Sequence, residues 1–167
     1  IQSDQTYLYV DVGGGSTEFT LYSNGDTKAT RSFELGTVRL LKKIVEPELW
    51  LEVEQWIKQI TKDYPKIDLI GSGGNINNIF KSSGKAVGKP LSFFYLSSYY
   101  QLLNSFTYEE RITELNLNAD RADVIIPATK IYLSAMKWTK ARRIFVPKIG
   151  LADGIIKSLY QEDNPRS

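Results

Sequence analysis

The most informative segment of the sequence is Asp11-Val12-Gly13-Gly14-Gly15-Ser16-Thr17-Glu18. The residues before it, 7–10, are aromatic or apolar, which is typical of a buried β-strand ending at Asp11. Residues 17–22 resume strand character, and Asn24-Gly25 then favours a tight hairpin turn. The sequence therefore predicts two strands on either side of a glycine-rich turn, and a third strand, residues 28–35, that returns antiparallel.

The remainder of the chain alternates helical and strand patterns. Apolar residues at helical spacing predict a short helix near residues 38–44 and a longer helix that begins at Pro47. Further helices are predicted after Gly71-Ser72-Gly73-Gly74 and over residues 92–106, 108–117, 119–138 (with Pro127 inside) and 150–160. Further strands are predicted at residues 67–70 and 143–146. The predicted fold class is α/β, a mixed sheet with antiparallel N-terminal strands that is covered by helices.

Length and composition indicate one folded domain. The chain has 167 residues, of which 42% are hydrophobic and 24% charged, so it can bury a core of ordinary size. We expect a single domain over residues 1–160 and a polar tail over residues 161–167. The chain starts with Ile1 instead of Met, and we therefore expect it to be a piece of a longer protein.

Charge and residue usage exclude several classes of function. The formal net charge of +2 is too small to indicate general nucleic-acid binding, and no apolar run has the ~20 residues of a membrane helix. Cysteine and histidine are both absent, which excludes disulfides, thiolate nucleophiles, structural zinc sites and Ser-His-Asp triads. Catalysis would have to use carboxylates, hydroxyls, backbone amides, Lys, Arg or an oxygen-bound metal. We expect a cytoplasmic protein that binds neither nucleic acid nor membrane.

Three glycine-rich segments are candidates for phosphate binding. In the first segment, glycine amides could contact a phosphate, while Asp11 and Glu18 could bind a hard cation such as Mg²⁺. In the second segment, Gly71 to Gly74, a helix begins directly after a strand, where free amides favour anions. The third, Gly150-Leu151-Ala152-Asp153-Gly154, begins the last predicted helix. Each segment also has a purely structural interpretation: a hairpin turn, a tight strand-to-helix turn and a capped helix start, respectively.

Taken together and in order, these segments resemble a known family. Residues 11–18 are similar to the DIGGGSTE signature of the exopolyphosphatase / guanosine pentaphosphate phosphohydrolase (Ppx/GppA) family. Residues 71–74 resemble the family's GxSGT/GxGGT turn, and residues 121–125 its R-x-D-x-I helix. Residues 32–40 are similar to its S-x-x-x-G-x-V-R/S stretch. At the family's GLREG position this chain has Ala152 and Asp153 in place of the Arg and Glu.

The resemblance implies a ribonuclease-H-like domain of the actin-like ATPase superfamily, the second of two such domains with an active site between them. It implies metal-assisted hydrolysis of the terminal phosphate of inorganic polyphosphate or guanosine pentaphosphate, with Mg²⁺ as the suspected cofactor. The first domain, absent from this chain, would supply a second phosphate loop and a catalytic glutamate. The chain alone is therefore expected to be inactive, and its partners are the substrate, the missing first domain and a possible second copy.

The site residues that the resemblance implies fall into two groups. Asp11 and Glu18 are expected to be catalytic and to bind the metal. The residues expected to bind phosphate are Gly13, Gly14, Gly15, Ser16, Thr17, Gly71, Ser72, Gly73 and Gly74.

Two other functions use the same phosphate clamp. One is an ATPase related to actin or to the acetate and sugar kinases, and the other is a non-enzymatic sensor of a phosphorylated ligand. A separate basic cluster, Lys137, Lys140, Arg142 and Arg143, could meet a polyanion, but it is interpreted as a solvated helix C-terminus that the helix dipole favours.

Overall fold

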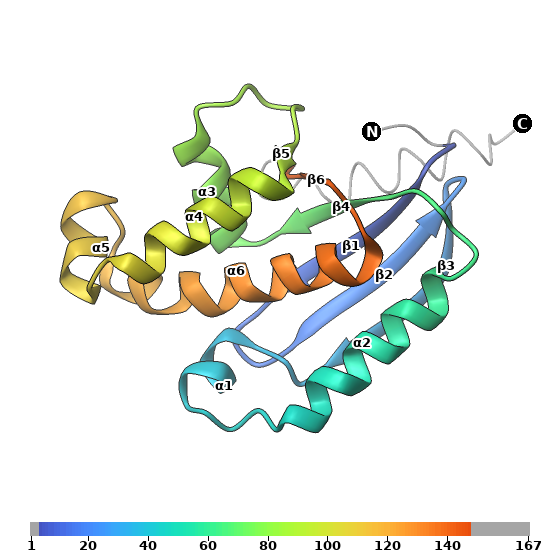
Figure 1. Cartoon of the computed structure of the whole chain (residues 1–167), viewed down its shortest axis with the longest axis horizontal. Coiled ribbons are helices and arrows are strands. Elements are labelled where there is room, and N and C mark those ends of the chain that lie inside the picture. Colours follow the sequence, from blue (N-terminus) through green and yellow to red (C-terminus); the bar gives the residue numbers. More distant parts are fainter. Residues whose placement is uncertain (1–3, 148–167) are drawn as a thin grey trace, which may run out of the picture.

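The structure is a computed structural model that describes residues 4–147, which form a six-stranded sheet and six helices (Figure 1). The strands are β1 Thr6–Val12, β2 Thr17–Ser23, β3 Asp26–Phe33, β4 Ile67–Ser72, β5 Leu91–Ser92 and β6 Arg143–Phe145. The helices are α1 Thr37–Leu41, α2 Pro47–Thr61, α3 Gly74–Ser83, α4 Phe93–Ser105, α5 Tyr108–Glu114 and α6 Ala119–Thr139. The predicted helix at 150–160, the polar tail and the segment Gly150 to Gly154 lie outside the described residues.

The sheet has the strand order β3-β2-β1-β4-β6-β5. Strands β1, β2 and β3 are antiparallel neighbours, whereas β4 runs parallel to both β1 and β6. The predicted mixed sheet with antiparallel N-terminal strands is confirmed. The short strand β5, antiparallel to β6, was not predicted, because two residues are too few to show a period of alternation.

Local sequence signals explain several element boundaries. Asn24 and Gly25 have positive φ values of 51° and 79°, as a two-residue hairpin turn requires, so β3 begins at Asp26, two residues earlier than predicted. Pro47 is the first residue of α2, as predicted, where its missing N–H removes no helical hydrogen bond. Thr107 and Glu110 form a capping box that starts α5.

Helix α6 contains Pro127, and a proline within a helical pattern is expected either to kink the helix or to mark its start. The second alternative is wrong, since α6 already begins at Ala119 and continues to Thr139. The side chain of Asn118 caps its first turn by accepting a hydrogen bond of 2.8 Å from the backbone N–H of Arg121.

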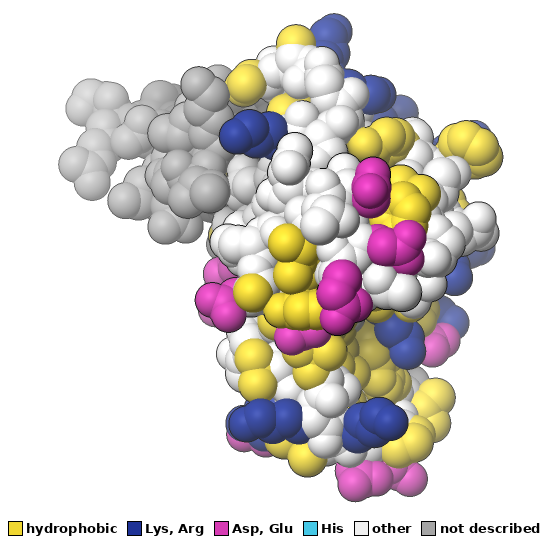
Figure 2. Space-filling view, turned by 90° about the vertical axis from the view of Figure 1, so that its left-hand side faces the viewer, with side chains coloured by type: hydrophobic (Ala, Val, Ile, Leu, Met, Phe, Trp, Pro, Cys, Tyr) yellow, Lys and Arg dark blue, Asp and Glu magenta, His cyan; other side chains and the backbone are white. Residues whose placement is uncertain are grey.

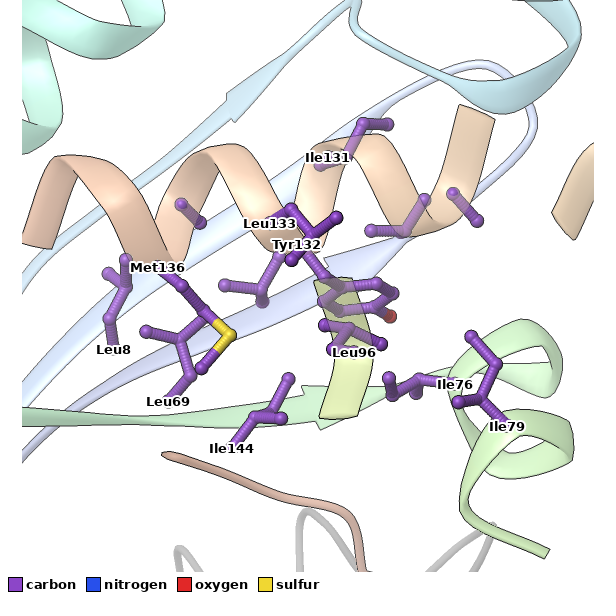
Figure 3. Close-up of a cluster of buried hydrophobic side chains, with 14 of the residues drawn as sticks. Leu8, Leu69, Ile76, Ile79, Leu96, Ile131, Tyr132, Leu133, Met136 and Ile144 are labelled. Atoms are coloured by element: carbon purple, nitrogen blue, oxygen red, sulfur yellow. The ribbon is translucent and has the colours of Figure 1, made fainter. Parts of the chain in front are cut away.

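The core forms where α6 packs along one face of the sheet (Figure 1). Figure 3 shows Tyr132 and Met136 of α6 pointing toward β4 and its neighbours, among side chains such as Leu69 and Ile144. All four of these side chains are fully buried. The close approach of α6 to β4 depends on Gly71, because a Cβ atom there would lie 2.8 Å from Cδ1 of Ile144 and 3.2 Å from Cε1 of Tyr132. Across residues 4–147, each helix falls short of the length or the apolar character needed to cross a membrane.

We expect Gly71→Ala to destabilise the fold by about 1–3 kcal/mol, because the added methyl group overlaps the core. Ile144→Val removes the Cδ1 atom nearest to that methyl group and costs about 0.5–1.5 kcal/mol alone. The double variant should therefore lose less stability than the sum of the two single variants, measured by urea unfolding. Strictly additive losses would show that the two side chains do not compete for the same space.

Candidate functional site

The two glycine-rich turns that the structure describes lie at the same edge of the sheet. Strands β1 and β4 are parallel neighbours, with Asp11 aligned to Ser72, so the turns that follow them leave the sheet side by side. Gly73 has a φ of 128° and its hypothetical Cβ would lie 3.4 Å from the carbonyl oxygen of Val12. The two turns therefore open on one edge of the sheet. Figure 2 views the molecule from this side.

Helix α1 holds the first glycine turn in place. The backbone N–H groups of Thr37 and Val38 donate hydrogen bonds of 3.0 and 2.9 Å to the carbonyl oxygens of Gly13 and Gly14. Gly36, just before the helix, approaches so closely that a Cβ there would lie 2.2 Å from the Gly14 carbonyl oxygen. The turn is therefore fixed by its carbonyl groups.

Three amide groups of the same turn remain available, whereas the N–H of Gly13, a predicted phosphate ligand, donates a hydrogen bond of 2.9 Å to the carbonyl oxygen of Ser16. Among residues 4–147, the backbone N–H groups of Gly14, Gly15 and Ser16 donate to no carbonyl oxygen. No atom would lie within 4 Å of a Cβ at Gly15, so a ligand has open access to the backbone there. Amides with these properties bind anions, because each offers a hydrogen-bond donor that no side chain shields.

The hydroxyl groups beside this turn differ from one another. Ser16 is exposed and adjoins the free amides. Thr17 is fully buried, and its hydroxyl group donates a hydrogen bond to the carbonyl oxygen of Leu35. The Thr17 hydroxyl thus anchors β2 to the segment before α1, and of the predicted phosphate ligands it is the one whose side chain is engaged inside the fold.

Asp11 and Glu18 face one another across the first two strands. They are register partners in the antiparallel β1–β2 pair, so both side chains point to the same face, with Cβ atoms ~5 Å apart. Both residues are exposed. Residues 4–147 hold no group of three or more His, Cys, Asp or Glu that could bind a metal, so a cation here would have these two carboxylates as its side-chain ligands.

The start of α3 forms the second half of the site. Gly73 precedes the helix and no side chain caps its first turn, which leaves its amides open to an anion. Arg121, from the first turn of α6, lies directly over this turn, since a Cβ at Gly74 would be 2.4 Å from its Nη2 atom. Asn75 is buried, and within the described chain its Oδ1 atom accepts no hydrogen bond.

Tyr132 of α6 holds the second glycine turn, residues 71–74, by a hydrogen bond. Its hydroxyl group donates a hydrogen bond of 2.7 Å to the carbonyl oxygen of Ser72, sixty residues away in the sequence. Burial, and to a lesser extent the charge of Asp11, raises the pKa of the Tyr132 hydroxyl above its usual range, so the group stays protonated and remains a donor.

Three residues at this edge were not among the predicted site residues. Arg121 is in the R-x-D-x-I segment, and that segment was the signal that could have identified it. Arg39 donates from Nε to the carbonyl oxygen of Gly15 at 2.7 Å, and it belongs to the segment that also contains Gly36. Tyr132 lies within the apolar pattern of a long helix, and nothing in that pattern indicates that its hydroxyl group bonds to the second glycine turn.

We expect Gly36→Ala to destabilise the protein by more than about 3 kcal/mol, because its methyl group would overlap backbone atoms that cannot move independently. Gly15→Ala is the matched control: it has open space around its Cβ and no positive φ, and should change stability by less than about 1 kcal/mol. Thermal unfolding of both variants tests this difference. Equal stabilities would contradict the close contact between Gly36 and the turn.

The chain is similar to one protein family. The family model described as the Ppx/GppA phosphatase family matches residues 1–163. An exopolyphosphatase from Cytophaga hutchinsonii has a TM-score of 0.71 to this chain at 21% sequence identity. A type II variant of the Aquifex aeolicus Ppx/GppA phosphatase has a TM-score of 0.70 at 20% identity. These similarities confirm the predicted ribonuclease-H-like, actin-like fold.

The match covers different shares of the proteins compared. It includes 99% of this chain and 59% of the Cytophaga hutchinsonii protein, and 93% of this chain and 57% of the Aquifex aeolicus protein. This chain therefore spans less than two thirds of either structure. A search among curated proteins gave no match.

Proposed function

This chain belongs to the Ppx/GppA phosphatase family, and we propose that it is the phosphate-binding half of a phosphoanhydride hydrolase. The substrates proposed are inorganic polyphosphate and guanosine pentaphosphate, from which the enzyme removes the terminal phosphate. The observation that carries the proposal is the parallel pairing of β1 with β4, which brings two turns with unpaired amides to one edge beside a pair of carboxylates.

In this proposal, backbone amides hold the phosphate. The N–H groups of Gly14, Gly15 and Ser16 bind its oxygens from one side, and the first-turn amides of α3 bind from the other side. Arg121, over Gly74, adds a positive charge that can donate two parallel hydrogen bonds to a phosphate. Phosphoryl transfer depends mainly on positioning and charge neutralisation, and both are within reach of these groups.

Asp11 and Glu18 are proposed to hold Mg²⁺. The pair fits this ion, because Mg²⁺ in proteins commonly uses one or two carboxylates together with water and substrate phosphate. When bound, Mg²⁺ supplies neutralising charge to the phosphate oxygens. The β1–β2 pairing keeps both carboxylates on one face, so that Asp11 and Glu18 can bind the same ion, and either carboxylate can orient a water molecule.

Hydrolysis also needs groups on the far side of the phosphate, because the attacking water and the leaving group lie in line. We assign these groups to another domain of the whole protein. Support comes from α1, beside the glycine turn, and the segment that follows it, where Val38, Leu41 and Ile44 are 41%, 44% and 55% exposed. Hydrophobic and charged side chains share this side of the molecule (Figure 2), as expected of a surface between domains.

The first experiment measures phosphate release by the whole protein from polyphosphate and from guanosine pentaphosphate, with and without Mg²⁺. Asp11→Asn and Glu18→Gln should each lower kcat by about 100-fold or more, while the free energy of unfolding changes by less than about 1 kcal/mol. Asp63→Asn, at the opposite end of β4, is the matched control and should retain full activity. The 167-residue chain alone should release no phosphate.

Other outcomes would contradict the proposal. Binding of the phosphate ligand without turnover, unchanged by Glu18→Gln, would indicate a sensor. Phosphate transfer that requires ATP would indicate a kinase-like protein. Equal losses of stability and rate in Asp11→Asn would assign Asp11 a structural role.

A second prediction concerns Arg121. In Arg121→Gln, the KM for the phosphorylated substrate should rise roughly 10- to 100-fold, because a charge-assisted hydrogen bond to phosphate is lost. Arg31→Gln is the control, since Arg31 on β3 forms an exposed ion pair with Glu52 on α2. An unchanged KM in Arg121→Gln would show that the guanidinium only packs on Gly74.

A further inference from the structure

The opposite edge of the sheet contains a pocket that the phosphatase proposal does not use. It has a volume of about 580 Å³ and lies where β4 and β6 begin and α6 ends. Because β4 and β6 are parallel, their N-terminal ends lie together, away from the glycine turns (Figure 1). The volume is within the range of small-molecule sites.

The lining of this pocket is strongly basic. Its cations come from three segments that are distant in the sequence: Lys66 before β4, Lys140 after α6, and Arg142 and Arg143 at β6. We interpreted part of this set as a solvated helix C-terminus. Lys140 and Arg142 are indeed exposed at the end of α6, and three of those four residues also line this pocket together with Lys66, whereas Lys137 lies outside the lining.

Among the described lining residues, the one acidic side chain is already neutralised. Asp68 is buried and receives two hydrogen bonds from Arg143, from Nε at 3.1 Å and from Nη2 at 2.8 Å. Within the described residues, Lys66, Lys140 and Arg142 form no ion pair. The pocket therefore carries three positive charges that no described side chain compensates.

The backbone conformation of Lys140 bears on the choice of a test variant. Lys140 is the C-cap of α6 and has a φ of 60°, a left-handed conformation that helix ends usually give to glycine or asparagine. A lysine at this position is held in an unfavourable conformation that projects a charge into the pocket lining. The neighbouring backbone is rigid, because the carbonyl oxygen of Arg142 accepts a hydrogen bond of 2.8 Å from Phe93.

We propose that this pocket is a second anion site, which binds a short inorganic polyphosphate chain. A chain of phosphates suits several cations around one pocket better than a single phosphate does, because it offers several negative charges to the three uncompensated positive charges. The remaining lining residues that the structure describes are Pro65 and Ile67, so this part of the lining offers no aromatic ring to stack on a base, which argues against nucleotides and single-stranded nucleic acid. The inference is independent of the proposed activity.

The experiment is an NMR titration of the isotope-labelled full chain with sodium tripolyphosphate. The amide signals of residues 66–68 and 140–143 should shift, and the affinity should exceed that for inorganic phosphate at equal ionic strength by roughly tenfold or more. Gly15→Ala separates the two sites, because it should leave these shifts unchanged while altering those of the glycine turn.

A double variant and a control variant test whether the basic side chains of the pocket bind tripolyphosphate. Lys140→Gly combined with Arg142→Gln should weaken tripolyphosphate binding at this pocket by roughly tenfold or more. The variant should remain folded, because glycine is preferred at the Lys140 backbone conformation. Lys137→Gln, one helical turn away and outside the lining, is the matched control and should bind as the unchanged protein does.

Three results would overturn the proposal. One is the absence of shifts at residues 66–68 and 140–143. Another is an equal loss of affinity in Lys137→Gln, which would indicate diffuse attraction instead of a site. The third is equal affinity for phosphate and tripolyphosphate, which would exclude a polyphosphate chain as the ligand of this pocket.

Discussion

Parallel pairing of β1 with β4 is the constraint on which the other features of this protein depend. The alignment of Asp11 with Ser72 brings two turns, sixty residues apart in the chain, to the same edge. The pairing needs α6 to cover it, and α6 approaches closely because Gly71 has no side chain. The same helix positions two side chains at the turn of residues 71–74: Tyr132 donates a hydrogen bond to Ser72, and Arg121 lies against Gly74. A loss of this pairing would remove the site and a large part of the core together.

The two proposed anion sites, at opposite edges of the sheet, differ in their chemistry. At the carboxyl ends of β1 and β4, the proposed ligands are backbone amides that donate to no carbonyl oxygen of residues 4–147, and the carboxylates Asp11 and Glu18 accompany them. The two carboxylates repel a polyanion, so the proposed Mg²⁺ ion would strengthen its binding there. At the other edge, side-chain cations outnumber the single buried Asp68, so an anion can bind without a metal.

At the proposed phosphate site, the hydrogen bonds that fix the first glycine turn use its carbonyl groups and leave the amides of Gly14, Gly15 and Ser16 available to a ligand. The carbonyl groups of Gly13 and Gly14 accept from the start of α1, and Thr17 is anchored to Leu35, so the loop is rigid before any ligand arrives. Rigid donors lose little conformational entropy on binding and are already oriented for the phosphate. The contact between Gly36 and Gly14 is part of this rigidity, although Gly36 itself has no polar side chain to offer.

Local patterns in the sequence were sufficient for most elements and for the glycine turns. Alternation, the Asn24-Gly25 turn and Pro47 act within a few residues, so β1 to β3, α2 and the turn before α3 could be predicted. The two-residue β5 could not, because its pairing with β6 depends on a partner about fifty residues away. Which side chains meet at an edge is likewise a property of the packed chain. Arg121 reaches Gly74, and Lys66 joins Lys140, because α6 and β4 pack together, and no local pattern records such long-range contacts.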